Sequence, residues 1–223
     1  MQTDIAITAS GPEHIDGALV LSQAVNWPHR AEDWELMRSL SKGAVALENG
    51  RVAATALATP FGPVGTLNMI IVDEALRGRG LGRKIMEEAM ARATPSEWRL
   101  VATADGLPLY QKLGFQACGE VQQFQGPVRN PDAAETLAPE GEDGLGWADL
   151  SDANALADLD RLATGMDRIS LVLSLLRIGR VLVHRENGAI AAWAALRPFG
   201  RGRVAGPVIC DSDIACARHV QAT

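Results

Sequence analysis

A short glycine-rich stretch, from Arg77 to Lys84, carries the residue types best suited to chemistry in this chain. It follows an apolar segment that ends at Val72, and it leads into a segment with helical periodicity from Gly82. Glycines let a backbone approach a ligand closely, and a helix N-terminus presents unpaired N–H groups with partial positive charge. The stretch contains four basic residues and no acidic one, although the formal net charge of the chain is −6. These features indicate a site for a multiply phosphorylated ligand, and a solvated basic turn is the alternative.

Two common phosphate-binding motifs do not fit this stretch. A dinucleotide fingerprint G-x-G-x-x-G that began at Gly78 would need glycine at position 83, where the chain has Arg83. A P-loop would need serine or threonine after Lys84, and Ile85 follows it. The sequence therefore argues against phosphotransfer that depends on a P-loop.

The stretch resembles a signature of the GNAT superfamily of N-acetyltransferases. That signature places arginine or glutamine three residues before a glycine, and glycine or alanine two residues later; Arg77, Gly80 and Gly82 match it. The longer run from Val72 to Gly82 is similar to the superfamily pattern V-D-P-x-x-R-G-x-G-L-G. It departs from that pattern at Glu74, where proline is frequent.

A second stretch supports the same resemblance. Leu109-Tyr110-Gln111-Lys112-Leu113-Gly114-Phe115 is similar to the superfamily's L-Y-E-K-L-G-F, in which glutamine can replace the glutamate. The resemblance covers residues 4 to 127. It implies an α/β fold of the α+β type, with a mixed, mostly antiparallel sheet flanked by helices.

The resemblance also implies a role for each matching residue. The strand through Ile70, Ile71 and Val72 would present backbone groups to the pantetheine arm of coenzyme A. The loop would hold the pyrophosphate of acetyl-CoA, the acyl donor. Its cofactor-binding residues are Arg77, Gly78, Arg79, Gly80, Leu81, Gly82 and Arg83. Tyr110 matches the tyrosine that protonates the departing thiolate.

The chemistry of direct acyl transfer explains the use of a tyrosine. Attack of an amine on a thioester needs a neutral amine close to the carbonyl carbon, and hydrogen-bond donors near the developing oxyanion. An acid that protonates the leaving sulfur assists the step, and a phenol with a pKa of about 10 is protonated at pH 7. Tyr110, the only tyrosine of the chain, is therefore predicted to be the catalytic acid. A packed aromatic ring with a solvated hydroxyl is the alternative.

The acceptor side of the site is less defined. No general base is identified, because Asn68 and Met69 stand where some superfamily members carry glutamate. Asp105 is either a base that acts through water or a solvated loop residue. Trp27 lies in a connection that borders the acceptor pocket in GNAT-like folds. It is predicted to bind substrate through an apolar or cation–π contact, or else to cover a helix pair.

The elements that must position these residues occur twice. Glu48-Asn49-Gly50-Arg51-Val52-Ala53-Ala54 recurs as Glu186-Asn187-Gly188-Ala189-Ile190-Ala191-Ala192, and Pro60-Phe61-Gly62 recurs as Pro198-Phe199-Gly200. The offset between the copies is constant, because 186 − 48 equals 198 − 60. Each copy is predicted to form three strands with an Asn-Gly hairpin turn, because Asn-Gly accepts the positive φ angles of that turn. The repeat predicts a duplicated fold.

Hydrophobic periodicity predicts the elements around these hairpins. In the first copy, strands are expected at 5–10, 65–72 and 99–103, with a further strand from Phe115. Helices are expected at 13–25, 31–40, 82–93 and 108–113. In the second copy, helices at 154–164 and 169–178 take the places of the first two.

The repeat also predicts the domain organisation. Residues 1–128 are expected to form the catalytic GNAT domain, 129–146 a linker, and 147–223 a partial, degenerate GNAT-like copy. That copy lacks the glycine-rich loop after Asp211, and the sequence ends soon afterwards at Thr223, so the copy is expected to be truncated and non-catalytic. Whether the chain is complete after Thr223 stays open. An open sheet edge in this copy would pair with the first domain or with a second subunit, which makes a homodimer one expected form.

Composition limits the partners and the compartment. The acidic net charge argues against nucleic acid and favours neutral or cationic small partners. No apolar run reaches the ~20 residues of a membrane span, and the start of the chain lacks a secretory signal pattern, so we expect a cytoplasmic protein without a membrane partner. Cys118, Cys210 and Cys216 form no C-x-x-C pair, which predicts reduced thiols and no metal site.

The leading hypothesis is an acyl-CoA-dependent N-acyltransferase that moves acetyl from acetyl-CoA to a primary amine of a small molecule or peptide. The alternative is a non-catalytic acyl-CoA-binding sensor or regulatory module. Tyr110 favours the enzyme, whereas the unidentified base and the degenerate second copy favour the sensor.

Overall fold

The computed structural model describes residues 5–127 and 144–210. The chain divides into two compact units, residues 1–122 and 123–223, and each is described by itself. Residues 129–143 of the expected linker lie outside the described residues, and so do all expectations for 211–223. Among the helices that are described, none is both long and apolar enough to cross a membrane.

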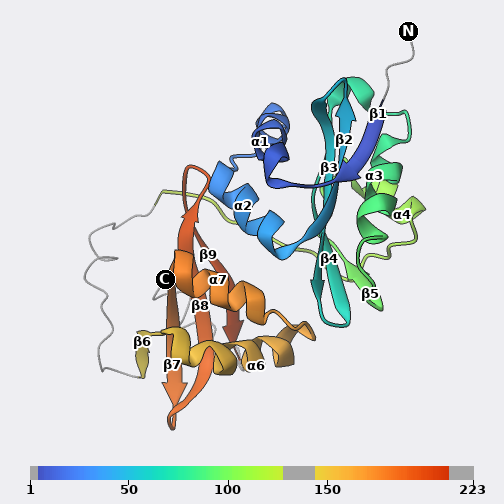
Figure 1. The fold of residues 1–223 in the computed structure, drawn as a ribbon. Helices are drawn as coiled ribbons and strands as arrows, with labels where there is room; N and C mark the ends of the chain where they lie inside the picture. The colour runs from blue at the N-terminus through green and yellow to red at the C-terminus, as the bar shows by residue number, and fades with distance from the viewer. Residues whose placement is uncertain (1–4, 128–143, 211–223) are drawn as a thin grey trace. The chain divides into compact units, whose positions relative to one another are not determined.

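The first unit is built on a five-stranded sheet in the order β1-β2-β3-β4-β5 (Figure 1). Its strands are β1 (Ile5–Ala9), β2 (Lys42–Glu48), β3 (Arg51–Phe61), β4 (Val64–Val72) and β5 (Glu97–Arg99). The pairs from β1 to β4 are antiparallel and the β4–β5 pair is parallel. The predicted mixed, mostly antiparallel sheet is therefore confirmed. Asn49 and Gly50, with φ of +51° and +82°, form the tight β2–β3 turn.

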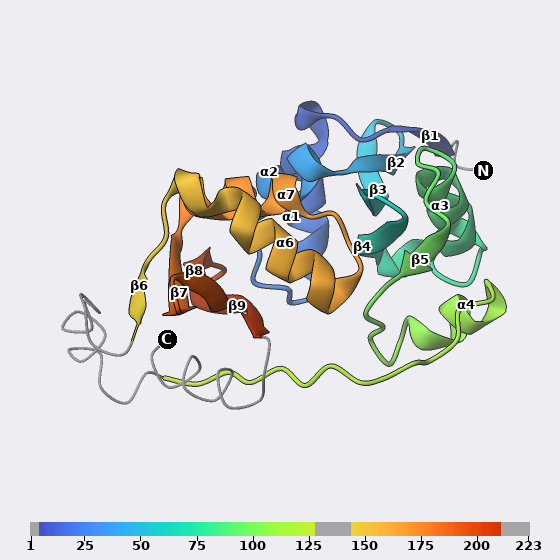
Figure 2. The ribbon, with the colours of Figure 1, turned by 90° about the horizontal axis from the view of Figure 1, so that it is seen from below.

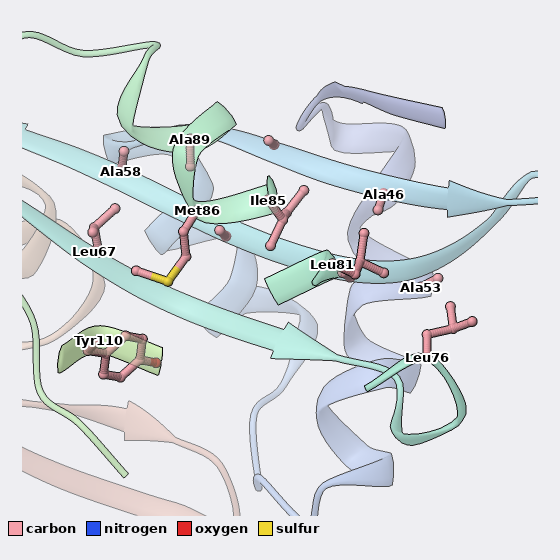
Figure 3. Close-up of a cluster of buried hydrophobic side chains, with 13 residues drawn as sticks. Ala46, Ala53, Ala58, Leu67, Leu76, Leu81, Ile85, Met86, Ala89 and Tyr110 are labelled. Carbon is pink, nitrogen blue, oxygen red and sulfur yellow. The ribbon is translucent and has the colours of Figure 1, made fainter. Parts of the chain in front are cut away.

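Helices cover both faces of this sheet. They are η1 (Pro12–His14), α1 (Ile15–Ala24), α2 (Ala31–Leu40), η2 (Glu74–Leu76), α3 (Leu81–Met90) and α4 (Leu107–Lys112). In Figure 1, α1 and α2 lie on one side of the sheet and α3 lies on the other. The apolar stripe of α3, which includes Ile85 and Met86, packs on a row of buried alanines from β2 and β3. Small strand side chains let the helix approach the sheet closely, so the α3 side forms a dense core (Figure 3).

The β5 edge of this sheet differs from the expectation. The strand expected at 99–103 is wrong in its bounds, because β5 shares only Arg99 with it and residues 100–103 form no strand. The strand expected from Phe115 is not found, since residues 115–127 form no strand. β5 pairs with β4 at only three positions, which end at Thr66 opposite Arg99. Apolar side chains beyond that point, such as Val101, are exposed instead of paired. Local pattern predicted strands here, but the chain beyond Arg99 does not pair with β4, although β4 continues to Val72.

The second unit repeats the front of the first. Its elements are β6 (Leu145–Trp147), η3 (Leu150–Asp152), α6 (Ala153–Thr164), α7 (Ile169–Ile178), β7 (Arg180–Glu186), β8 (Ala189–Phe199) and β9 (Gly202–Cys210). The sheet order is β6-β7-β8-β9, and α6 and α7 lie side by side against it (Figure 2). The bounds of α7, β7, β8 and β9 equal those of α2, β2, β3 and β4 shifted by the offset of the sequence repeat (for example, 180 − 42 equals 186 − 48). Residues 145 and 146, expected in the linker, belong to β6.

Both sheets also share an irregularity. The β3–β4 ladder shifts register between Thr55 and Leu57, and the β8–β9 ladder shifts between Ala194 and Leu196. The Thr55–Ile71 and Ala58–Leu67 pairs recur at the repeat offset as Trp193–Ile209 and Leu196–Ala205, so both ladders carry a β-bulge between these pairs, and the shift in the second sheet lies one residue later along β8. A bulge inserts one unpaired residue and bends the strand.

Candidate active site

A fixed corner connects β4 to the glycine-rich loop. The Asp73 carboxylate accepts hydrogen bonds from the Ala75 backbone N–H at 3.0 Å and from the Arg51 guanidinium at 2.6 Å. The hydrogen bond from Arg51, followed by that from Ala75, lowers the pKa of Asp73 below its ordinary value. The next turn, η2, buries Leu76 in the core on the α3 side. The loop therefore leaves the sheet from a corner held by an ion pair and an apolar anchor.

Two glycines of the loop adopt a left-handed backbone. Gly78 has φ of +76° and Gly80 has φ of +79°, a region that residues with a Cβ rarely occupy. A Cβ added at either position would meet nothing within 4 Å, so these glycines serve the backbone shape and not packing. Left-handed residues turn successive N–H groups toward one side, which produces an anion-binding concavity.

The N-terminus of α3 continues this concavity. Gly80 is its N-cap, no side chain caps it, and its first turn has no acidic residue. The first backbone N–H groups of a helix lack intrahelical partners, and the helix dipole makes this end favourable for negative charge. The loop and the start of α3 therefore fit a phosphate group.

Gly82 has a second role that the motif alone does not show. A Cβ added there would lie 3.1 Å from Leu109 Cδ2 and 3.6 Å from Val72 Cγ2. The glycine thus allows α3 to pack closely against α4 and the end of β4. A bulky residue at 82 would press on Leu109, the neighbour of Tyr110, and would disturb both the loop and the helix that carries the tyrosine.

The basic side chains of the loop divide into two groups. The Arg77 Nε donates to the Val72 carbonyl at 3.2 Å, and Arg83 donates to the Lys112 carbonyl at 3.0 Å, so both brace the surrounding backbone. Arg79 and Lys84 instead line a cavity of about 130 Å³ beside the loop. Neither forms an ion pair within the described ranges, so their charges are available to a ligand.

β4 presents an open backbone edge next to this loop. On the β5 side, the strand pairing of β4 ends at Thr66 among the described residues. The Asp73 N–H donates to the Ala53 carbonyl on β3 at 2.9 Å. Because backbone groups alternate in direction along a strand, those of Ile71 also face β3, while those of Ile70 and Val72 face the open side. The Val72 carbonyl is taken by Arg77, which agrees with this alternation.

Tyr110 lies on α4 in the same core cluster as α3 (Figure 3). It is 7% exposed, and its ring contacts that of Phe115 edge to face with centroids 6.3 Å apart. Burial raises the pKa of the Tyr110 phenol above its ordinary value. The hydroxyl is therefore protonated at neutral pH, as a proton donor must be.

Sequence reasoning missed the glycine that makes room for this tyrosine. A Cβ at Gly106 would lie 2.8 Å from a ring carbon of Tyr110 and 2.9 Å from its hydroxyl oxygen. Gly106 stands four residues before Tyr110, the spacing that places two residues on the same face of a helix. This four-residue spacing could have indicated that Gly106 lies next to Tyr110. It could not have indicated the direction of the tyrosine ring.

The structure does not bring Trp27 to the cluster that holds Tyr110. Trp27 is half-buried against the core on the α1 and α2 side, with its ring 5.4 Å from that of His29. Asp105 is exposed before α4. On β4, the Asn68 amide nitrogen donates to Thr59 Oγ1 at 2.8 Å, and Thr59 bonds Ser41 at 2.6 Å. The buried Asn68 Oδ1 has no hydrogen-bond partner within the described ranges.

Comparisons with known proteins find acetyltransferases that are similar to this chain. Residues 40–117 match the family described as "Acetyltransferase (GNAT) domain", a range that contains the glycine-rich loop and Tyr110. The chain is 27% identical over 219 residues to the uncharacterized N-acetyltransferase YitH of Bacillus subtilis (strain 168), covering 93% of this chain and 74% of YitH.

A solved structure shows the same fold across both units. A proposed acetyltransferase from Pyrococcus horikoshii matches with a TM-score of 0.72 at 19% identity, covering 100% of this chain and 76% of that one. The first unit therefore contains the region that matches the GNAT acetyltransferase domain, and a second unit whose elements repeat the front of the first follows it.

Proposed function

We propose that the first unit transfers an acyl group, acetyl, from acetyl-CoA to a primary amine by direct attack. The observation that carries this proposal is the open edge of β4, which lies between an uncapped helix N-terminus and a buried, protonated tyrosine. The three features supply backbone groups for an extended donor, a site for its phosphates, and a proton for its leaving group.

Each part of acetyl-CoA has a proposed place along the loop and β4. Its pyrophosphate would be held by the N–H groups of the loop from Arg77 to Arg83, where Gly78 and Gly80 supply the left-handed turns. Its pantetheine arm would lie along β4 and pair with the outward Ile70 carbonyl and Val72 N–H. Ile71 would act indirectly by anchoring β4, because its side chain packs in the core on the α1 and α2 side.

The chemical step uses few protein groups. The nitrogen of a neutral amine forms a bond to the thioester carbon, and the carbon–sulfur bond breaks. Tyr110 donates its proton to the sulfur, and burial favours this role because it keeps the phenol neutral. The excess proton of the amine leaves to water or to a base that the described residues do not identify, and Tyr110 regains a proton from water, which balances the step. Trp27 is proposed to contact the acceptor, a small molecule or peptide amine.

The second unit is proposed to be non-catalytic. Its described part repeats the hairpins and the first two helices but contains no counterpart of α3 or α4. We infer one acetyl-CoA site per chain, in the first unit.

An acyl-CoA sensor is the second candidate, and one observation favours it. The β4 position expected to carry a base holds Asn68, whose amide cannot take up a proton at neutral pH. A sensor would bind acetyl-CoA at the same edge without turnover.

Calorimetry and a thiol-release assay separate the two functions. The enzyme should bind acetyl-CoA and release free thiol with at least one member of a panel of small amines, amino acids and peptides. Binding without amine-dependent thiol release across the panel would favour the sensor. A folded chain without acetyl-CoA binding would contradict both.

A further inference from the structure

The bulge in β4 is held by one buried side chain of β3. Thr55 is fully buried, and its Oγ1 donates to the Met69 carbonyl at 2.7 Å. Met69 has φ of +50°, a left-handed backbone that a residue with a Cβ seldom adopts. Such a conformation persists when surrounding contacts fix it, and residues of this kind gather at functional sites. The hydroxyl of Thr55 is the contact that reaches the strained peptide directly.

This hydrogen bond also sets the direction of the next amide. The C=O and N–H groups of one trans peptide point in opposite directions. Because the Met69 carbonyl is drawn toward Thr55 on β3, the N–H of Ile70 in the same peptide points away from β3. That side is the open edge of β4, where pairing with β5 has already ended. Thr55 therefore aims a backbone donor at the edge.

The second unit offers an internal comparison. Its β8–β9 ladder has a bulge in the same stretch, one residue later along β8, and the counterparts of Thr55 and Met69 are Trp193 and Pro207 (193 − 55 equals 207 − 69). The buried indole nitrogen of Trp193 has no hydrogen-bond partner among the residues described. The bulge of this fold thus forms without the hydroxyl. We therefore attribute the hydroxyl of Thr55 to the proposed site of the first unit.

We propose that Thr55 is a positioning residue for acyl transfer, because it fixes the Met69–Ile70 peptide so that the Ile70 N–H donates to the thioester oxygen as negative charge develops there. This inference rests on the proposed function. A preorganised donor of this kind acts at the transition state more than in binding, so its loss lowers kcat while acetyl-CoA affinity changes little.

Three variants separate the hydroxyl from the shape of the side chain. Thr55→Val keeps the branched shape and removes the donor, Thr55→Ala removes both, and Thr55→Ser keeps the donor. Removal of one oxyanion donor lowers kcat by about 10²- to 10³-fold, and a donor that is misaligned should cost about 10- to 100-fold. We expect that loss in the valine and alanine variants and a near wild-type rate in the serine variant. If the valine variant does not fold, the alanine and serine pair still isolates the hydroxyl.

A spectroscopic readout distinguishes positioning from a structural role. The infrared carbonyl band of bound acetyl-CoA, labelled with ¹³C at the carbonyl, should lie at a higher frequency in Thr55→Val than in the wild type, because the hydrogen bond to the thioester oxygen is weakened. Circular dichroism and melting curves serve as folding controls. A folded Thr55→Val variant with an unchanged band, or with KM raised and kcat intact, would overturn the role of Thr55. A wild-type chain that does not bind acetyl-CoA would instead overturn the proposed function.

Discussion

Replacement of Gly80 by alanine tests whether the loop backbone holds the donor. Gly80 has φ of +79°, and a Cβ added there would meet no protein atom within 4 Å. The substitution therefore introduces backbone strain without a steric clash inside the protein. Gly50, in the β2–β3 turn, provides a matched control with φ of +82° and equally open surroundings.

The structure gives the size of the effect. A left-handed backbone costs an L-residue about 1–2 kcal/mol, and in Gly50→Ala this cost should lower the free energy of unfolding. In Gly80→Ala the loop can relieve the strain by rotating out of the left-handed region, which turns the N–H groups at the start of α3 away from the ligand. Binding must then restore the strained form. We expect acetyl-CoA affinity to fall by about 5- to 30-fold, the factor that about 1–2 kcal/mol represents.

Calorimetric titration with acetyl-CoA, together with denaturant unfolding of each variant, measures both quantities. Gly50→Ala should lose stability and keep wild-type affinity, whereas Gly80→Ala should lose affinity and a smaller amount of stability. Equal acetyl-CoA affinity in the two variants would refute the assignment of the loop as the phosphate site.

Three further predictions follow from the same site. Tyr110→Phe keeps the packed ring and removes the proton donor, so steady-state kinetics should show kcat lowered by about 10²-fold with acetyl-CoA affinity nearly unchanged; full turnover would mean that the thiolate leaves without this acid. The pKa of Tyr110 is raised by burial, so the alkaline fall of kcat/KM that depends on this group should lie above about pH 10, and a fall centred near pH 8 that disappears in Tyr110→Phe would contradict the role. The same shift stabilises the fold below the unfolded pKa, and this stabilisation is lost as pH rises through the folded pKa. Titration should give one acetyl-CoA per chain, and two equivalents would show that the second unit also binds it.

Local sequence pattern was sufficient for the parts of the fold that local chemistry determines. The helices expected at 31–40 and 169–178 are α2 and α7 with the same bounds, since apolar residues recur there at helical spacing. The Asn-Gly turns form in both units because these residues accept positive φ. The constant offset between the two copies extended this reasoning to the second sheet.

Features that depend on distant neighbours could not be predicted in this way. Leu100 and Val101 have the composition of a strand, but β5 ends at Arg99 because the chain beyond it does not pair with β4, although β4 continues to Val72. The left-handed Met69 and the hydrogen bond from Thr55 join residues on two strands, and neither residue type signals a bulge. The contact of Gly82 with Leu109 likewise depends on how α3 meets α4.

The most direct test of acyl transfer is to measure released thiol and acylated amine together, in one reaction of the purified chain with acetyl-CoA. The proposed mechanism predicts equal molar amounts of the two products, with both rates lowered about 10²-fold in Tyr110→Phe. Thiol release without acylated amine, or product formation that is unchanged in Tyr110→Phe, would contradict it.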